Sequence, residues 1–306
     1  MTTVKIKLLY IGGYSRSGST ILSNVLGEID GFFNAGELMF IWDRLISEEG
    51  ICGCGVHVRD CNIWSRVLDN AFEDTEKPEY PKMIQMRNDN WQSGNVIRWR
   101  LSSKAKADLV SRLGYYLDNL EKLYWAAGTM ISDDVIIDSS KNPTYLYLLS
   151  LIEGIELHVV HIVRDPRATA YSWLSKKQGF TSIPPWRSSV SWDAKNMAME
   201  VLKGQFNEKY IQVRYEDFIA NPKNSLRTIL EVLGEEQRSL NFITDDGITF
   251  KRNHCVYGNP DLFKKGRVKL LLDDRWKSMT VFDKLLATGL TWPFIYRYGY
   301  HRALSS

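Results

Sequence analysis

The stretch that decides the fold is YIGGYSRSGST, residues 10–20. From its second glycine onward it nearly matches the phosphate-binding pattern G-x-x-x-x-G-K-[ST], since both glycines and the final threonine are in register. Ser19 replaces the lysine that would reach the terminal phosphates of a nucleoside triphosphate, and the nearest cation is Arg16, inside the loop. The stretch therefore predicts a site for a phosphorylated ligand that does not need this lysine.

The same stretch lies where a predicted strand passes into a predicted helix. Residues 5–13 (KIKLLYIGG) are an apolar run that ends at glycines, and residues 19–29 (STILSNVLGEI) place apolar side chains on one helical face. The first N–H groups of a helix lack intrahelical partners and favour a bound anion. We predict an anion site formed by Ser15, Arg16, Ser17, Gly18, Ser19 and Thr20.

Three later segments have the composition of buried strands: residues 134–140 (DVIIDSS), 156–165 (ELHVVHIVRD) and 209–218 (KYIQVRYEDF). The last two are followed by Asp-Pro and Asn-Pro pairs, which cap and begin helices. Alternating strands and helices predict an α/β fold, with a central parallel sheet flanked by helices on both faces. Ligands of such sheets bind beyond the carboxyl ends of the strands.

The length of 306 residues predicts a single domain, 1–306, with two segments that fit this rhythm poorly, 50–105 and 178–192. Residues 50–105 are rich in tryptophan, and residues 178–192 contain proline, glycine and tryptophan. Long irregular segments on a rigid scaffold often carry function, so these are candidate lids or walls of an acceptor pocket. The alternative is that they are ordinary surface insertions whose aromatic side chains pack locally.

The charge balance argues against a polyanionic partner. The chain has 39 basic and 36 acidic residues, too even for a nucleic-acid-binding surface but compatible with a local cationic site. We find no secretory signal pattern and no run of about 20 apolar residues that would cross a membrane. We therefore expect a cytoplasmic protein that binds a small anion, with no nucleic-acid or membrane partner; the oligomeric state stays open.

Three of the four cysteines, Cys52, Cys54 and Cys61, cluster in the stretch CGCGVHVRDC. With His57 as a fourth ligand they could bind zinc, although the spacing C-x-C-x2-H-x3-C is not one of the common zinc patterns. A knuckle of reduced thiols and a single disulfide are the alternatives, and the sequence leaves all three open.

A second anion site is indicated by HIVRDPRATAYSWL, residues 161–174. Arg164 ends a predicted strand, and Ser172 follows on the next helix, so a cation and a hydroxyl could flank one anion. Arg164 could instead form a buried ion pair with Asp165 or another carboxylate.

The chain resembles a known family at these positions. YSRSGSTIL and VRDPRATAYS resemble the 5′-phosphosulfate loop and the 3′-phosphate motif of sulfotransferases that use 3′-phosphoadenosine 5′-phosphosulfate (PAPS). Further similar segments are GEL (36–38), DSSKNP (138–143), VRYEDF (213–218) and GNPDLFKKGRVKLLLDDRW (258–276). The resemblance spans residues 6–277 and leaves mainly 50–105 unmatched. It implies a sulfotransferase fold like that of P-loop NTPases, with PAPS as co-substrate and no metal.

This resemblance gives a chemical reason for the missing lysine. PAPS has no β- and γ-phosphates for a lysine to bridge. A loop with arginine in place of the lysine usual in cytosolic sulfotransferases is more similar to the loops of the tyrosylprotein and bacterial branches of the family. Arg16 can donate two hydrogen bonds to the phosphosulfate, where charge grows during transfer. By resemblance, Lys141 lies near the sulfuryl group or the bridging oxygen, and Glu37 is the base for the acceptor.

Two of these assignments have alternatives. Glu37 could cap a helix or pair with a surface cation. His254 is the rival base, because histidine serves in other sulfotransferases. His158 and His161 lie in a predicted buried strand, and His301 lies near the end of the chain.

The segment FKKGR (263–267) resembles the basic element that closes over the 3′-phosphate, through Lys265 and Gly266. It could also be a solvated charge run. Tyr215 could line the adenosine side or pack in the core.

The sequence thus predicts a PAPS-dependent sulfotransferase that acts on a hydroxyl, in preference to an amine, and releases adenosine 3′,5′-bisphosphate. The expected acceptor is a small molecule of the natural-product class. A kinase using ATP and magnesium, and a module that binds the bisphosphate without turnover, are the alternatives. The acceptor is not named by the sequence; five tryptophans could wall its pocket or simply pack, namely Trp91, Trp99, Trp173, Trp186 and Trp192.

Overall fold

A five-stranded sheet of order β2-β3-β1-β4-β5 forms the centre of the computed structural model, which describes residues 5–131, 134–174, 181–251, 253–258 and 266–301. Every neighbouring pair of strands is parallel. The predicted α/β architecture with a central parallel sheet is therefore confirmed. The strands are β1 (Ile6–Gly13), β2 (Phe32–Gly36), β3 (Val135–Lys141), β4 (Ile155–Val163) and β5 (Tyr210–Arg214).

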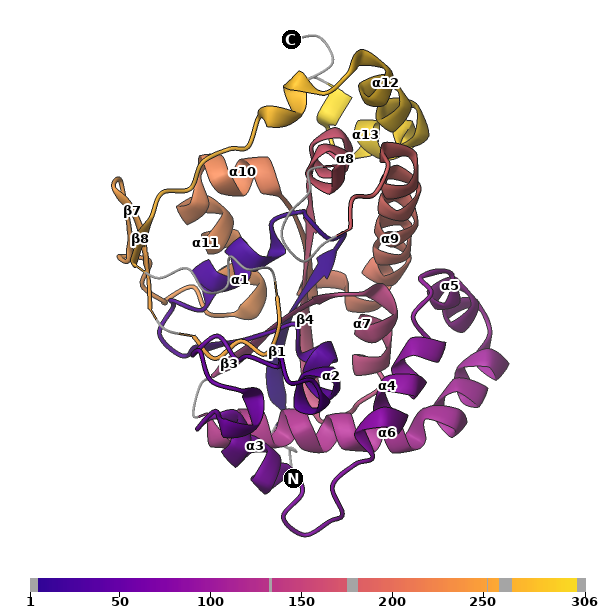
Figure 1. Ribbon diagram of the computed structural model, residues 1–306, viewed down its shortest axis with the longest axis vertical. Coiled ribbons are helices and arrows are strands. Elements are labelled where there is room, and N and C mark those ends of the chain that lie inside the picture. Colours follow the sequence, from indigo (N-terminus) through magenta and orange to yellow (C-terminus); the bar gives the residue numbers. More distant parts are fainter. Residues whose placement is uncertain (1–4, 132–133, 175–180, 252, 259–265, 302–306) are drawn as a thin grey trace.

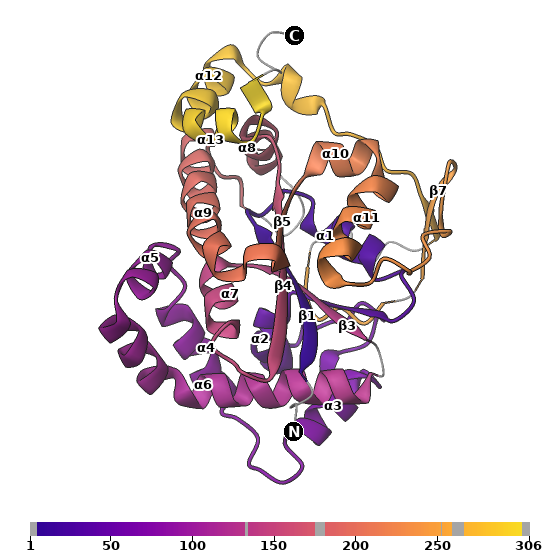
Figure 2. The same cartoon turned by 180° about the vertical axis from the view of Figure 1, so that it is seen from behind.

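Helices cover both faces of the sheet (Figures 1 and 2). The long helices α6 (Ser103–Met130) and α9 (Pro185–Phe206) pack with α7 (Pro143–Leu149) against one face. Helices α1 (Ser19–Leu26) and α11 (Pro222–Leu233) pack against the other. Along β1, Leu8 and Tyr10 join the first core, whereas Leu9 and Ile11 join the second. The central strand is buried on both faces, as its continuous apolar sequence requires.

The remaining elements surround this frame. The helices are α2 (Ile41–Ile46), α3 (Trp64–Ala71), α4 (Tyr80–Asp89), α5 (Gly94–Leu101), α8 (Pro166–Leu174), α10 (Tyr215–Ala220), α12 (Val281–Leu290) and α13 (Trp292–Arg297). A small antiparallel sheet, seen at the edge of Figure 1, contains β6 (Ile243–Thr244), β7 (Gly247–Phe250) and β8 (Gly266–Val268). Among the described helices, none combines the length and apolar character needed to cross a bilayer.

The structure differs from the sequence-based prediction at the end of one strand and in one strand that was not predicted. The strand predicted over 209–218 ends at Arg214, and α10 begins at the next residue. Glu216 and Asp217 lie in the first turn of α10, where acidic side chains favour the positive end of the helix dipole. The edge strand β2 was not predicted, because its sequence FFNAG has neither alternation nor a β-branched residue.

The two segments expected to be irregular are largely helical, so that expectation was wrong. Residues 50–105 contain α3, α4, α5 and the start of α6. Residues 185–192 begin α9, while residues 178–180 lie outside the described part of the chain. Prolines misled the prediction: Pro81 and Pro185 stand at helix starts, where a missing N–H costs nothing.

Two of the three glycines in the opening stretch explain why the chain can pass from β1 into α1. Gly13 has a φ of 134°, and an added Cβ would lie 2.3 Å from the backbone oxygen of Ile162 in β4. Gly18 has a φ of 90°, and its Cβ would lie 2.3 Å from the ring of Tyr215. Side chains are excluded at both positions by backbone conformation and by space.

Candidate active site

A cleft of about 590 Å³ opens at the carboxyl ends of β1, β3 and β4, the edge at which ligands of parallel sheets bind. This volume is in the range of pockets that bind cofactors and metabolites. Ten residues predicted from the sequence line it: Ser15, Arg16, Gly18, Ser19, Thr20, Glu37, Lys141, Arg164, Ser172 and Tyr215. The fold therefore gathers into one cleft residues that are spread over two hundred positions of the sequence.

The loop between β1 and α1 forms one wall of the cleft. Its helix starts at Ser19 after the left-handed Gly18, so the N–H groups of the first turn lie at the cleft wall. The guanidinium of Arg16 lies 4.9 Å from the ring centroid of Trp173, which itself lines the cleft. A planar cation held against an aromatic face beside backbone donors is a strong arrangement for a phosphate or sulfate group.

Opposite this loop, Lys141 and Glu37 form a close ion pair through Nζ and Oε1. Glu37 is buried and Lys141 is half-buried, and both line the cleft. The pair joins the end of β3 to the residue that follows β2. A carboxylate in contact with a cation inside the cleft could accept a proton while the cation stabilises negative charge.

A buried network fixes the turn that carries Lys141. The carboxylate of Asp138 accepts hydrogen bonds from the hydroxyls of Tyr124 and Ser140 and, at 2.8 Å, from the Ser140 N–H. Burial raises the pKa of Asp138 to about 6. The Ser140 hydroxyl also accepts the Met39 N–H at 3.1 Å, which ties the turn to the segment after Glu37. The lysine is therefore held from a rigid strand end.

Both Arg16 and Lys141 have left-handed backbone conformations, with φ values of 72° and 65°. Among the described residues, Asn207 is the only other non-glycine residue with a positive φ. Such a conformation costs of order 1 kcal/mol or more for a residue with a side chain. That two of three such residues lie in one cleft indicates that the fold tolerates strain there to aim two cations at one point.

Arg164, directly after β4, lines the cleft beside the backbone of Arg16. Its Nη1 donates to the backbone oxygen of Arg16 at 3.1 Å, and its guanidinium lies 4.6 Å from the ring centroid of Tyr215. Nη2 lies 3.6 Å from a carboxylate oxygen of Asp273. Ser172 lines the same cleft. The cleft therefore contains both the second cation and the hydroxyl that the sequence analysis singled out.

Of the two pairings that the sequence left open for Arg164, the one with Asp165 is formed by Arg167, whereas Arg164 itself pairs with another carboxylate, that of Asp273. Arg167 donates to both carboxylate oxygens of Asp165, at 2.9 and 2.5 Å, and to the backbone oxygen of Tyr300 at 3.3 Å. Both charged side chains are almost completely buried. Arg167 is therefore a structural residue, and it leaves Arg164 directed at the cleft.

Lys195, on α9, is a cleft residue that the sequence analysis missed. Its Nζ lies 5.3 Å from the ring centroid of Trp91. Desolvation, and next the charge of Lys141, lower the pKa of Lys195 to about 8. No motif surrounds Lys195 in the sequence, so only the three-dimensional packing of α9 reveals it.

Within the described part of the chain, three predicted site residues do not line the cleft. Ser17 is fully buried, and its hydroxyl has no hydrogen-bond partner among the described residues. Gly266 begins β8, and Val268 to Leu271 line the cleft instead. His254 lies against Cys61, with Nδ1 3.2 Å from the sulfur. Lys265 lies outside the described residues.

His57, the histidine nearest to the cysteines in sequence, is not part of their cluster. Its Nε2 lies 2.9 Å from the backbone oxygen of Ser47, and its Nδ1 accepts the Arg59 N–H at 3.2 Å. Both ring nitrogens are thus engaged elsewhere. His57 was the wrong choice of fourth residue, because the chain folds His254 against the thiols instead.

The five tryptophans divide between the cleft, the core and the surface. Trp91 and Trp173 line the cleft. Trp99 and Trp192 are buried in the core, and Trp186 is 54% exposed. Phe40 and Tyr257 complete the aromatic lining near Glu37, with ring centroids 4.9 Å apart. The aromatic wall thus exists, but with a different membership from the one expected.

Comparison with known proteins decides the family. A family model described as the sulfotransferase family matches residues 9–239. The chain belongs to the sulfotransferase family. It is a sulfotransferase enzyme, and the matched range contains the loop, Glu37, Lys141, Arg164 and Lys195.

Two solved structures of sulfotransferase domains have folds similar to that of this sulfotransferase. The chain is similar to the sulfotransferase domain of the Synechococcus PCC 7002 olefin synthase, with 19% identity, 95% of each chain covered and a TM-score of 0.56. It is also similar to the sulfotransferase domain from the curacin biosynthetic pathway, with 15% identity, 97% of this chain and 98% of that chain covered, and a TM-score of 0.50. No curated protein sequence matches the chain.

The two arginines of the segment VRDPR give a test of this description of the sulfotransferase cleft. R167M leaves the buried Asp165 carboxylate without its partner, so we expect the free energy of unfolding to fall by about 3–5 kcal/mol. R164M removes a cation at the cleft, so we expect much less destabilisation but at least about tenfold weaker binding of adenosine 3′,5′-bisphosphate. Urea unfolding and calorimetry measure the two effects, and equal effects of the two variants on both would contradict the assignment.

Proposed function

We propose that the protein transfers a sulfuryl group from PAPS to a hydroxyl of a small molecule and releases adenosine 3′,5′-bisphosphate. The observation that carries this proposal is the meeting of Arg16, Lys141, Glu37 and Arg164 in one cleft. Several cations in one cleft suit a ligand with anionic groups at both its 5′ and 3′ positions. PAPS supplies an activated sulfuryl group joined to the 5′-phosphate.

The residues present fit this co-substrate. Arg16 and the N–H groups at the start of α1, which line the cleft, can serve the 5′ end. Arg164 and Ser172 would hold the 3′-phosphate, and Asp273, whose carboxylate now lies near Arg164, would yield to it and keep its contact with Arg275. The ring of Tyr215, stacked under Arg164, is placed to line the adenosine side.

The catalytic roles follow from the charges around the cleft. Glu37 takes the proton from the acceptor hydroxyl as the acceptor oxygen bonds to sulfur. The bond between sulfur and the 5′-phosphate oxygen breaks, and Arg16, Lys141 and Lys195 stabilise the charge that grows on that oxygen.

The acceptor side is the aromatic part of the cleft, where Phe40, Trp91 and Tyr257 lie around Glu37. These rings favour a largely apolar molecule that presents one hydroxyl to the carboxylate. The two similar solved domains come from an olefin synthase and from the curacin biosynthetic pathway, which supports a natural-product acceptor.

The four cysteines form no disulfide, in keeping with a reaction in the reducing cytoplasm.

Calorimetry with adenosine 3′,5′-bisphosphate, compared with ATP plus magnesium, tests the choice of co-substrate. We expect binding of the bisphosphate and at least about tenfold weaker binding of ATP, because position 19 lacks the lysine that reaches terminal phosphates. Preference for ATP would favour a kinase. Tight binding of the bisphosphate, with no transfer of label from PAPS to any hydroxylated metabolite tested, would favour a binding module.

The variant E37Q tests the base. Glutamine keeps the size of the side chain but cannot take a proton, so we expect normal affinity for adenosine 3′,5′-bisphosphate and a fall in kcat of about 10²–10⁴-fold. The matched control is E48Q, because Glu48 is exposed in the loop after α2. Undiminished turnover of E37Q would contradict the assignment of Glu37 as the base.

Lys195 gives the cleft a predicted pH dependence. With a pKa of about 8, its ammonium is charged below that pH and neutral above it, so affinity for the bisphosphate falls as the pH rises through about 8. The ligand's phosphates are already ionised there. We expect K195M to bind more weakly and to lose this step, whereas K203M, at an exposed position of the same helix, keeps it. An unchanged step in K195M would show that another group titrates.

A further inference from the structure

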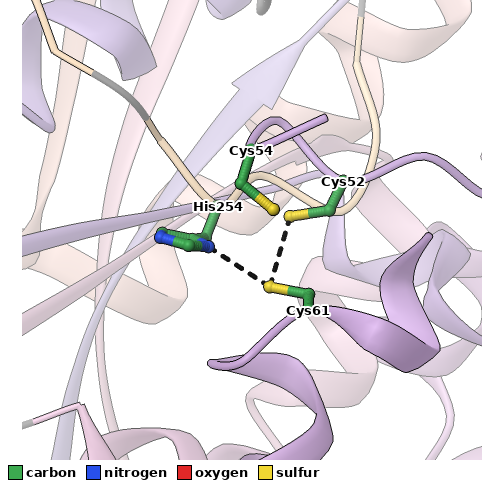
Figure 3. A group of neighbouring side chains, drawn as sticks. All are labelled: Cys52, Cys54, Cys61 and His254. Carbon is green, nitrogen blue, oxygen red and sulfur yellow. Dashed lines mark hydrogen bonds between the residues drawn. The ribbon is translucent and has the colours of Figure 1, made fainter. Parts of the chain in front are cut away.

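Three thiols and one imidazole that have no part in the proposed reaction meet at one point of the structure (Figure 3). Cys52, Cys54 and Cys61 come from the segment between α2 and α3, and His254 comes from the segment after β7. The three sulfurs and a histidine nitrogen all lie within 4.8 Å of one another. All three cysteines are buried and His254 is half-buried.

The distances fit a common metal centre. The sulfurs of Cys52 and Cys61 lie 3.6 Å apart, and the sulfur of Cys61 lies 3.2 Å from Nδ1 of His254. In a tetrahedral zinc site, with bonds of about 2.0–2.3 Å, neighbouring ligand atoms are about 3.3–3.8 Å apart. A disulfide would need the sulfurs at about 2.05 Å. The spacing therefore favours a shared ion over a bond between the two cysteines.

The backbone holds the four ligands in place from both segments. The Cys52 N–H donates to the Val56 oxygen at 2.8 Å, which closes the loop that presents Cys52 and Cys54. The Gly53 N–H donates to the Cys255 oxygen at 2.9 Å, and a Cβ on Gly53 would lie 1.8 Å from Oδ1 of Asn253. The loop is thus pressed directly onto the segment that carries the histidine.

A second contact joins the same two segments on the other side of the cluster. Nε1 of Trp64, in the first turn of α3, donates to the backbone oxygen of His254 at 2.5 Å. The Cys61 oxygen accepts the Ser65 N–H at 2.8 Å, so Cys61 stands at the start of that helix. Hydrogen bonds therefore position the proposed ligands on the loop, before the helix and on the distant segment.

We propose that Cys52, Cys54, Cys61 and His254 bind one zinc ion in a structural Cys3His site. Three soft thiolates and one imidazole in tetrahedral proximity are a ligand set that selects zinc over the harder ions magnesium and calcium. All four positions are filled by the protein, as in structural sites, and His254 does not line the catalytic cleft. The zinc therefore takes no part in sulfuryl transfer.

The ion would fasten the segment around residue 254 to the body of the enzyme. Just beyond His254, the Val256 N–H donates to the Ala35 oxygen, and the Tyr257 oxygen accepts the Glu37 N–H, both at 2.9 Å. The side of the cleft that holds Glu37 and Tyr257 thus depends on a segment that zinc would hold in place. The proposal itself needs only the four ligands and stands independently of the identity of the acceptor.

Metal analysis of the purified full-length protein, prepared under reducing conditions from zinc-supplemented culture, tests the proposal. We expect about one zinc per chain in the wild type, and at least about tenfold less in C61S and H254N. Two variants serve as controls and should keep the zinc: H57N changes the histidine nearest in sequence, and C255S changes a buried cysteine outside the cluster.

Cobalt substitution of the wild type removes any dependence on variants that fail to fold. After the zinc is stripped and replaced by Co²⁺, a tetrahedral site with thiolates gives thiolate-to-cobalt charge transfer in the near ultraviolet and intense visible bands. Stripping should also lower the thermal unfolding midpoint, and zinc should restore it. Wild-type protein without stoichiometric zinc or these bands, or a Cys52–Cys61 disulfide in unreduced peptide maps, would overturn the proposal.

Discussion

The structure depends on one constraint, the sharp passage of the chain from the central strand β1 into α1. At Gly13 and Gly18 neighbouring groups from β4 and α10 approach so closely that no side chain fits. This closeness brings the start of α1 to the carboxyl edge of the sheet, where Arg16 and the first turn of the helix line the cleft. The rest of the cleft is arranged around this fixed anion site.

The second level of order is the pairing of charges around that site. The buried Asp138 network holds the turn of Lys141, and Lys141 in turn pairs with Glu37. Arg167 neutralises Asp165 and so leaves Arg164 for the cleft. Within the short segment VRDPR, one arginine thus stabilises the fold and the other lines the cleft. A cleft with several cations and the carboxylate of Glu37 is suited to stabilise an anionic leaving group while one proton is removed.

The sequence predicted the parts of this arrangement that depend on local chemistry. The glycine loop, the strand ends and the helix starts at Asp-Pro and Asn-Pro all have short-range signals, and ten predicted residues line the cleft. It could not predict Lys195 or the approach of His254 to the cysteines, because both result from long-range packing. The helices between residues 50 and 105 were also missed. Composition alone does not distinguish a proline at the start of a helix from a proline in a loop.

A crystal structure of the protein with adenosine 3′,5′-bisphosphate tests the central claim most directly. The account predicts the 5′-phosphate against the N–H groups of residues 15–20, within reach of Arg16 and Lys141. It predicts the 3′-phosphate on Arg164 and Ser172, with Asp273 moved away from the arginine. A nucleotide bound in the opposite direction, or bound outside this cleft, would contradict it.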